Sequence, residues 1–204
     1  MARREEVREA PRTYEEAYAE LAAEMRALHI ARVSEMPRIE LYLDQVLSIV
    51  TSELAFMSPQ GERILTGAMV NNYVKQRIVP APTKKRYTRR HLASLLFVCS
   101  FKRVLSIAQI GQVFALGSQA GVDIERAYDD MLTLFEVTLA ALFPANAVEP
   151  ARECPGELCL YDLSGNRVAS QLERLLEKAV VMLAYTVYVD RMLALQVEVA
   201  TGED

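Results

Sequence analysis

The sequence lacks several residue types and motifs on which common activities depend. Its 204 residues include no tryptophan, two histidines and three cysteines. So few cysteines, and an odd number of them, provide no disulfide framework. Cys154 and Cys159 have no nearby histidine with which to complete a four-ligand zinc site. A Gly-rich phosphate loop, G-x-S-x-G and H-E-x-x-H are all absent. We therefore expect no enzyme activity, no catalytic residue, no metal and no cofactor.

The chain also lacks an obvious signal for export or for crossing a membrane. It opens on the charged stretch "MARREEVREA", which does not resemble a secretory signal. Its longest uncharged apolar run near the C-terminus, residues 179–189, has 11 residues, whereas a membrane span needs about 20. Apolar residues make up 51% of the chain and charged residues 25%. We expect a soluble, cytoplasmic, globular protein with no membrane partner.

Acidic residues are missing from one long segment of this acidic protein. Residues 63–122 contain ten of the 23 Lys and Arg residues and none of the 27 Asp and Glu residues. Soluble proteins usually mix charges of both signs on their surface. A one-sided segment of this length is typical of a surface that binds a polyanion.

Nearly every segment has the apolar spacing of an amphipathic helix. A stripe beginning at Tyr14 is followed, after Met36-Pro37, by a second stripe beginning at Ile39. Thr66, Thr88, Ser106 and Asp123 can cap four further helices. The last element runs from about residue 167 to 199 without Gly or Pro. The pattern predicts an all-α helical bundle with a long C-terminal helix and at most a small hairpin.

The short helix at residues 66–76 has the length of a recognition helix. Met69, Val70 and Tyr73 share its inward side, which leaves Asn71, Asn72 and Lys75 facing elsewhere. Asn can bridge two edge atoms of adenine, and Lys can reach guanine or a phosphate.

Basic residues continue beyond this helix. Lys84, Lys85 and Arg86 follow two prolines, and Arg89 and Arg90 occupy the first turn of the next helix. Arg at a helix N-terminus opposes the helix dipole, and a phosphate bound there would offset this mismatch. The sequence thus predicts contacts with duplex DNA, made by Asn71, Asn72, Lys75, Arg77, Lys84, Lys85, Arg86, Arg89 and Arg90.

The stretch "MVNNYVKQRIVPAP…KRYTRRHLASLLFVCSFKRVLSIAQI" resembles the MerR-type helix-turn-helix. In that family a recognition helix ending in paired aromatics is followed by a Leu-Leu-Pro step, a wing and two further helices. Here Tyr73 matches the second aromatic, 78–80 the step, 86–88 the wing exit and 106–107 the start of the shorter helix. The stretch is even more similar to an uncharacterised bacterial domain-of-unknown-function family that shares the "NNYVK" core.

The resemblance implies a winged helix-turn-helix with a minimal wing. Asn71 and Asn72 replace the usual Arg and Tyr, and Arg77 stands where Gly commonly ends the recognition helix. A left-handed cap at Arg77 would therefore be strained. We expect three regions: an N-terminal helix or arm (1–36), a DNA-binding domain (37–117) and a helical C-terminal dimerisation or effector region (118–204).

Two functions remain open from the sequence. One is a DNA-binding transcriptional regulator. The other is a helical protein-interaction or small-molecule-sensing module in which the helix-turn-helix is vestigial. Residues 179–189 are apolar on all sides, so either the chain's other helices or a second subunit must cover them. We expect a homodimer joined through Val181, Tyr185, Tyr188 and Met192. An unidentified small-molecule effector is left open.

Overall fold

The computed structural model describes residues 13–58, 63–148, 156–168 and 170–201. Within these ranges it contains helices and isolated β-bridges but no strand, which confirms the all-α expectation. The helices are α1 (Tyr14–Arg26), α2 (Leu43–Glu53), the short 3-10 helix η1 (Ala55–Met57), α3 (Gly67–Lys75), α4 (Arg89–Phe101), α5 (Ile107–Gln119), α6 (Ile124–Leu142) and α7 (Ser170–Thr201).

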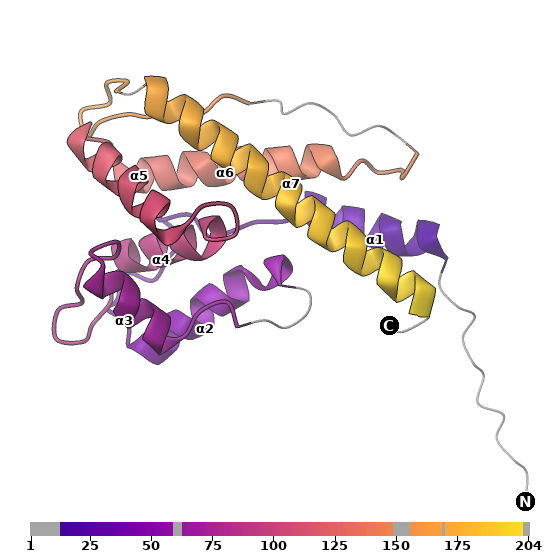
Figure 1. The fold of residues 1–204 in the computed structure, drawn as a ribbon, viewed down its shortest axis with the longest axis horizontal. Helices are drawn as coiled ribbons and strands as arrows, with labels where there is room; N and C mark the ends of the chain where they lie inside the picture. Colours follow the sequence, from indigo (N-terminus) through magenta and orange to yellow (C-terminus); the bar gives the residue numbers. More distant parts are fainter. Residues whose placement is uncertain (1–12, 59–62, 149–155, 169, 202–204) are drawn as a thin grey trace, which may run out of the picture.

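The helices form two groups that meet at α4. α1, α6 and α7 pack together on one side, and α2 and α3 lie on the other (Figure 1). α4 contacts α2, α5, α6 and α7, and each of its residues from His91 to Phe101 is buried. A helix buried all round needs neighbours on every side. The apolar sequence of α4 therefore places it at the centre of the bundle.

Helix starts follow the capping residues named above. Thr66 accepts a hydrogen bond from the Met69 amide at 3.2 Å, and Ser106 accepts one from the Gln109 amide at 3.3 Å. The Asp123 carboxylate accepts from the amides of Glu125 and Arg126. These side chains bond backbone amides that a helix leaves unpaired in its first turn.

Two sequence expectations near the N-terminus are corrected. The first helix ends at Arg26, well before Met36-Pro37. Ile39, expected on the apolar stripe of the second helix, is 70% exposed. The reason is a backbone pairing between Leu41 and Tyr87, with N–O distances of 2.8 and 2.9 Å. This bridge holds the chain extended before α2 and buries Leu41 in place of Ile39.

α7 begins at Ser170, three residues after Arg167, where the sequence expectation placed its start. Arg167 instead forms a two-bond ion pair with Glu173 (2.9 and 3.0 Å). The Glu173 side chain is buried and also accepts the Leu160 amide at 2.8 Å. The Arg167 hydrogen bonds lower the pKa of Glu173 below its ordinary value, so the carboxylate stays charged and fastens the preceding loop to α7.

Residues Gln171–Thr201 of α7 are long and apolar enough to cross a membrane, judged by length and composition alone. Their most apolar window has a mean hydropathy of 1.4, and 28% of it is buried. In this fold α7 packs along α6 and α1 and reaches α4 and α5. Ion pairs from Asp190 to Arg103 and from Arg191 to Glu24 attach it to the bundle. α7 is thus a packing helix with one side left uncovered.

Candidate nucleic-acid interface

α3 lies at the edge of the molecule, on the opposite side from α1 and the C-terminal end of α7 (Figure 1). Val70 and Tyr73 are buried, as predicted, and Met69 is partly buried against the core. Asn71, Asn72 and Lys75 are exposed. The helix therefore holds itself in place by one side and presents two amides and an ammonium group on the other.

Arg77 ends α3 in the left-handed conformation that the sequence made strained for a residue other than Gly. Its φ is 58°. The Ile78 amide donates to the Tyr73 carbonyl and the Arg77 amide to the Val74 carbonyl, each at 3.0 Å. This pair of bonds is the Schellman motif, in which Gly usually occupies the Arg77 position. The side chain of Arg77 is exposed, so the strained residue carries its charge into solvent next to α3.

A two-residue turn follows at Lys84-Lys85. Thr83 and Arg86 pair as an isolated antiparallel bridge, and the Arg86 amide donates to the Thr83 carbonyl at 2.8 Å. Lys84 and Lys85 have φ values of 50° and 62°. Positive φ at both central residues is the requirement of a type I′ hairpin turn, which normally selects Asn-Gly. The connection thus forms a minimal hairpin with two exposed lysines at its tip.

Tyr42 is a surface residue of this region that sequence reasoning missed. The Arg86 guanidinium carbon lies 3.6 Å from the centre of the Tyr42 ring, and its Nη2 donates to the Tyr42 hydroxyl at 2.5 Å. Tyr42 also caps α2, where its amide donates to Gln45 at 2.9 Å. The spacing from Tyr42 to Gln45 could have indicated the cap. Its contact with Arg86, 44 residues away, left no local pattern.

The N-terminus of α4 is closed by its own histidine. The Thr88 amide donates to His91 Nδ1 at 3.1 Å, and the His91 ring packs edge-on against Tyr87 at 5.7 Å. His91 is 9% exposed, and burial lowers its pKa below the ordinary value. The ring is therefore neutral near pH 7, with Nδ1 as the acceptor. Arg90 is exposed and Arg89 half-buried in the same turn.

The basic residues of this region share one electrostatic property. Lys75, Arg77, Lys84, Lys85, Arg86, Arg89 and Arg90 take part in none of the ion pairs found in the described part of the chain. By contrast, arginines elsewhere pair with carboxylates, as in Arg32–Glu136 at 2.5 Å and Arg191–Glu24 at 2.6 Å. The nine residues predicted to contact DNA thus all lie on α3, the hairpin or the first turn of α4. Arg86 and Arg89 are half-buried, and the rest are exposed.

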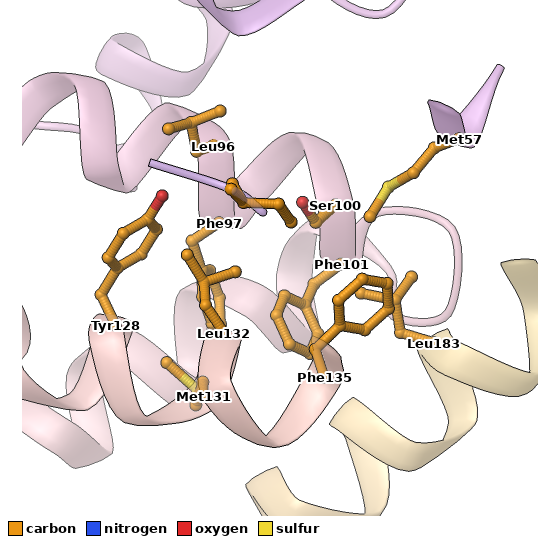
Figure 2. Close-up of a pocket in the computed structure, with 11 residues that line it drawn as sticks. Met57, Leu96, Phe97, Ser100, Phe101, Tyr128, Met131, Leu132, Phe135 and Leu183 are labelled. Carbon is orange, nitrogen blue, oxygen red and sulfur yellow. The ribbon is translucent and has the colours of Figure 1, made fainter. Parts of the chain in front are cut away.

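No other region described offers an equivalent site. A crevice lined mostly by apolar side chains from α4 and α6 has a volume of about 10 Å³ (Figure 2), room for about one water molecule. The described residues contain no cluster of three or more His, Cys, Asp or Glu side chains able to hold a metal. Cys154 lies outside the described residues. Burial raises the pKa of Cys99 to about 11, so this thiol stays protonated.

The residues expected at a dimer interface do not share one surface. Tyr188 packs its ring 5.0 Å from that of Phe143, and both Tyr188 and Met192 lie against the core of their own chain. Val181 is partly buried, whereas Tyr185 is 50% exposed. Five side chains of α7 instead form an exposed apolar row with 44 to 62% exposure: Met182, Tyr185, Val189, Leu193 and Val197. We call this row the α7 stripe.

Comparison with known proteins identifies a family for the segment that holds these features. No curated protein and no solved structure matches the chain. A family model does match residues 31–131, which run from the segment before α2 into α6 and include α3, the hairpin and the start of α4. These residues constitute a DUF1836 domain, a domain of unknown function.

Proposed function

We propose that the protein is a DNA-binding transcriptional regulator of the MerR-like helix-turn-helix type. In this proposal α3 enters the major groove, where Asn71, Asn72 and Lys75 meet base edges. The hairpin and the first turn of α4 lie along the phosphate backbone. The partners are duplex DNA and a second copy of the chain, and the protein acts in the cytoplasm.

One observation carries the proposal. Only three residues other than Gly have a positive φ in the described part of the chain, and they are Arg77, Lys84 and Lys85. A left-handed conformation costs a side chain roughly 1–2 kcal/mol, which Gly largely avoids. Nothing in the fold requires a cation at these positions, because none of the three pairs with a carboxylate of the described residues. Strained residues that persist despite their cost cluster at functional sites, and three cations around one exposed helix fit a phosphate backbone.

The arrangement of charges also supports DNA over an acidic partner within the chain. The acidic side of α1 lies far from α3 (Figure 1), and its Glu24 pairs with Arg191 of α7. The acidic helix therefore does not neutralise the basic region. Asn71 and Asn72, exposed on α3, are the residue type that pairs with adenine.

The experiment is a titration of duplex DNA at several salt concentrations. If about five side chains per subunit neutralise phosphates, log K falls against log salt with a slope near −4.5 per subunit. Lys84→Ala flattens the slope by about one unit. Lys178→Ala is the matched control, because Lys178 is equally cationic but lies on α7 beside Glu177; it leaves the slope unchanged. An affinity independent of salt, or none for duplex DNA in dilute buffer, contradicts the proposal.

The second copy is proposed from the α7 stripe. Its five side chains recur every three or four residues along about 22 Å of helix, and none of them is charged. The residues outside the described ranges are mostly polar, charged or proline, so they offer no apolar segment of this length to cover it. Acidic residues on neighbouring α1 disfavour an anionic lipid surface. A second α7 is uncharged along the same row and is available to every molecule, and two-fold pairing suits paired DNA half-sites.

A further inference from the structure

A small cavity lies beside the C-terminal end of α4. Its volume is about 40 Å³. Leu54, Met57 and Cys99 provide part of its wall, and three cationic residues complete it: Arg63, Lys102 and Arg103. No residue lining the cavity is acidic.

The charges around this cavity are only partly compensated. Arg103 bonds Asp190 of α7 through Nη2, but its Nε is buried and has no hydrogen-bond partner among the described residues. Lys102 Nζ donates to the Ile64 carbonyl at 2.7 Å, which satisfies one N–H without neutralising the charge. A buried N–H without an acceptor costs roughly 1–3 kcal/mol, and more for a charged group. The cavity therefore has donors and positive charge but too few acceptors.

We infer that this cavity is a binding site for a small anion, with the chemistry of a carboxylate group or a halide ion. A single water needs about 10–15 Å³, so the cavity accepts roughly three heavy atoms. That is the size of a carboxylate. The anion accepts from Arg103 Nε and lies within reach of the charges of Lys102 and Arg63. Leu54 and Met57 give one wall an apolar surface suited to the carbon end of a small organic acid.

The position of the cavity gives an occupant two routes to the rest of the molecule. Ile64, which bonds Lys102, lies two residues before Thr66, the cap of α3. Arg103, on the other side, is bonded to α7. A bound anion would therefore fasten the segment leading into α3 to the helix that carries the α7 stripe. Control of DNA binding by this anion rests on the proposed function, whereas the binding itself does not.

The test is an NMR titration of the full chain without DNA, at constant ionic strength. The probes are sodium acetate and sodium chloride, exchanged against each other and against sodium methanesulfonate. The readout is the side-chain Nε–H signal of Arg103, with that of Arg126 as an internal control. We expect a saturable shift of the Arg103 signal and none for Arg126. Saturation by acetate alone assigns a carboxylate ligand, and saturation by chloride assigns a halide.

Two variants separate the site from general salt effects. Lys102→Met removes one charge, and we expect affinity to fall about tenfold or more, since a charged hydrogen bond contributes roughly 1.5–3 kcal/mol. Arg63→Ala weakens binding without disturbing the core, because Arg63 is exposed. The absence of a saturable Arg103 shift with either anion, or equal binding by wild type and both variants, overturns the inference. Because DNA is absent, failure of the regulator proposal leaves this result unaffected.

Discussion

At the scale of single residues, Arg77 separates stability from function. Replacing it by Gly relieves the left-handed strain at φ 58°. The relief of about 1–2 kcal/mol exceeds the roughly 0.5–1 kcal/mol that Gly costs in backbone entropy. We expect Arg77→Gly to raise the free energy of unfolding in urea by up to about 1 kcal/mol. The same change should flatten the salt slope of DNA binding by about one unit.

Two further substitutions test that argument. Arg77→Asn tolerates the left-handed conformation without a charge, so it should weaken DNA binding as Gly does. Arg77→Lys keeps both the strain and the charge and should change neither quantity much. A loss of stability in Arg77→Gly would mean that the Arg77 side chain supports the fold, and that its charge is not retained for a ligand.

His91 predicts a pH dependence of stability that is also local to one side chain. Burial lowers its pKa in the folded state, whereas the unfolded chain titrates near 6.5. Below about pH 6.5 the unfolded state therefore binds more protons, and stability falls with pH until the folded pKa is passed. Protonation also removes the Nδ1 acceptor of the Thr88 amide. We expect the urea midpoint to decrease between pH 7.5 and 5.

His91→Gln is the control for this dependence. Gln at the third position of a helix can still accept the capping amide but does not titrate. The wild-type midpoint should fall more steeply with pH than that of the variant, because other titrating groups contribute equally to both. Parallel pH profiles would show that His91 is not the group responsible.

At the scale of elements, the hairpin between α3 and α4 offers a replacement of an entire turn. Asn-Gly in place of Lys84-Lys85 supplies the residues that a type I′ turn prefers. We expect this double variant to be more stable than wild type and to retain the helix content of the bundle. Its salt slope for DNA should flatten by about two units. An unchanged slope would remove the hairpin from the interface, even if DNA binding persists through α3.

The elements also show where sequence reasoning succeeds and where it stops. Thr66, Ser106 and Asp123 predict the starts of α3, α5 and α6, because capping is a contact between residues two or three apart. The side chains of α3 that face the core follow from its period. The Lys84-Lys85 turn does not, since Lys is a poor residue for positive φ and its conformation depends on the surrounding fold.

Contacts across long stretches of sequence explain the other differences. The pairing of Leu41 with Tyr87 displaces Ile39 from the core, and no local pattern in either segment indicates it. In α7 the run 179–189 is apolar on every side, so periodicity could not say which side faces α6. Tyr188 and Met192 were expected at a dimer interface for this reason. The structure places them against their own chain and leaves Tyr185 uncovered.

At the scale of the whole molecule, the α7 stripe predicts a homodimer whose interface differs from the residues named by the sequence. Light scattering at micromolar concentration should return about twice the chain mass of 22.9 kDa. Val189→Glu places a charge in the middle of the row, where a partner would bury it without a counter-ion. Such burial costs far more than the contact contributes. The variant should therefore be monomeric while keeping its helical circular dichroism, because Val189 is 50% exposed.

Two controls decide what covers the stripe. Lys178→Glu introduces the same charge on α7 outside the row and should leave the mass unchanged. DNA binding by the monomeric Val189→Glu should keep its sign of salt dependence, with the slope reduced toward that of one subunit. If wild type is instead monomeric in light scattering and sediments with lipid vesicles, and Val189→Glu abolishes that sedimentation, the stripe binds a membrane and the dimer is refuted. An α7 stripe that binds neither a second copy nor lipid would have to bind another protein, and a pull-down competed by an isolated α7 peptide would reveal it.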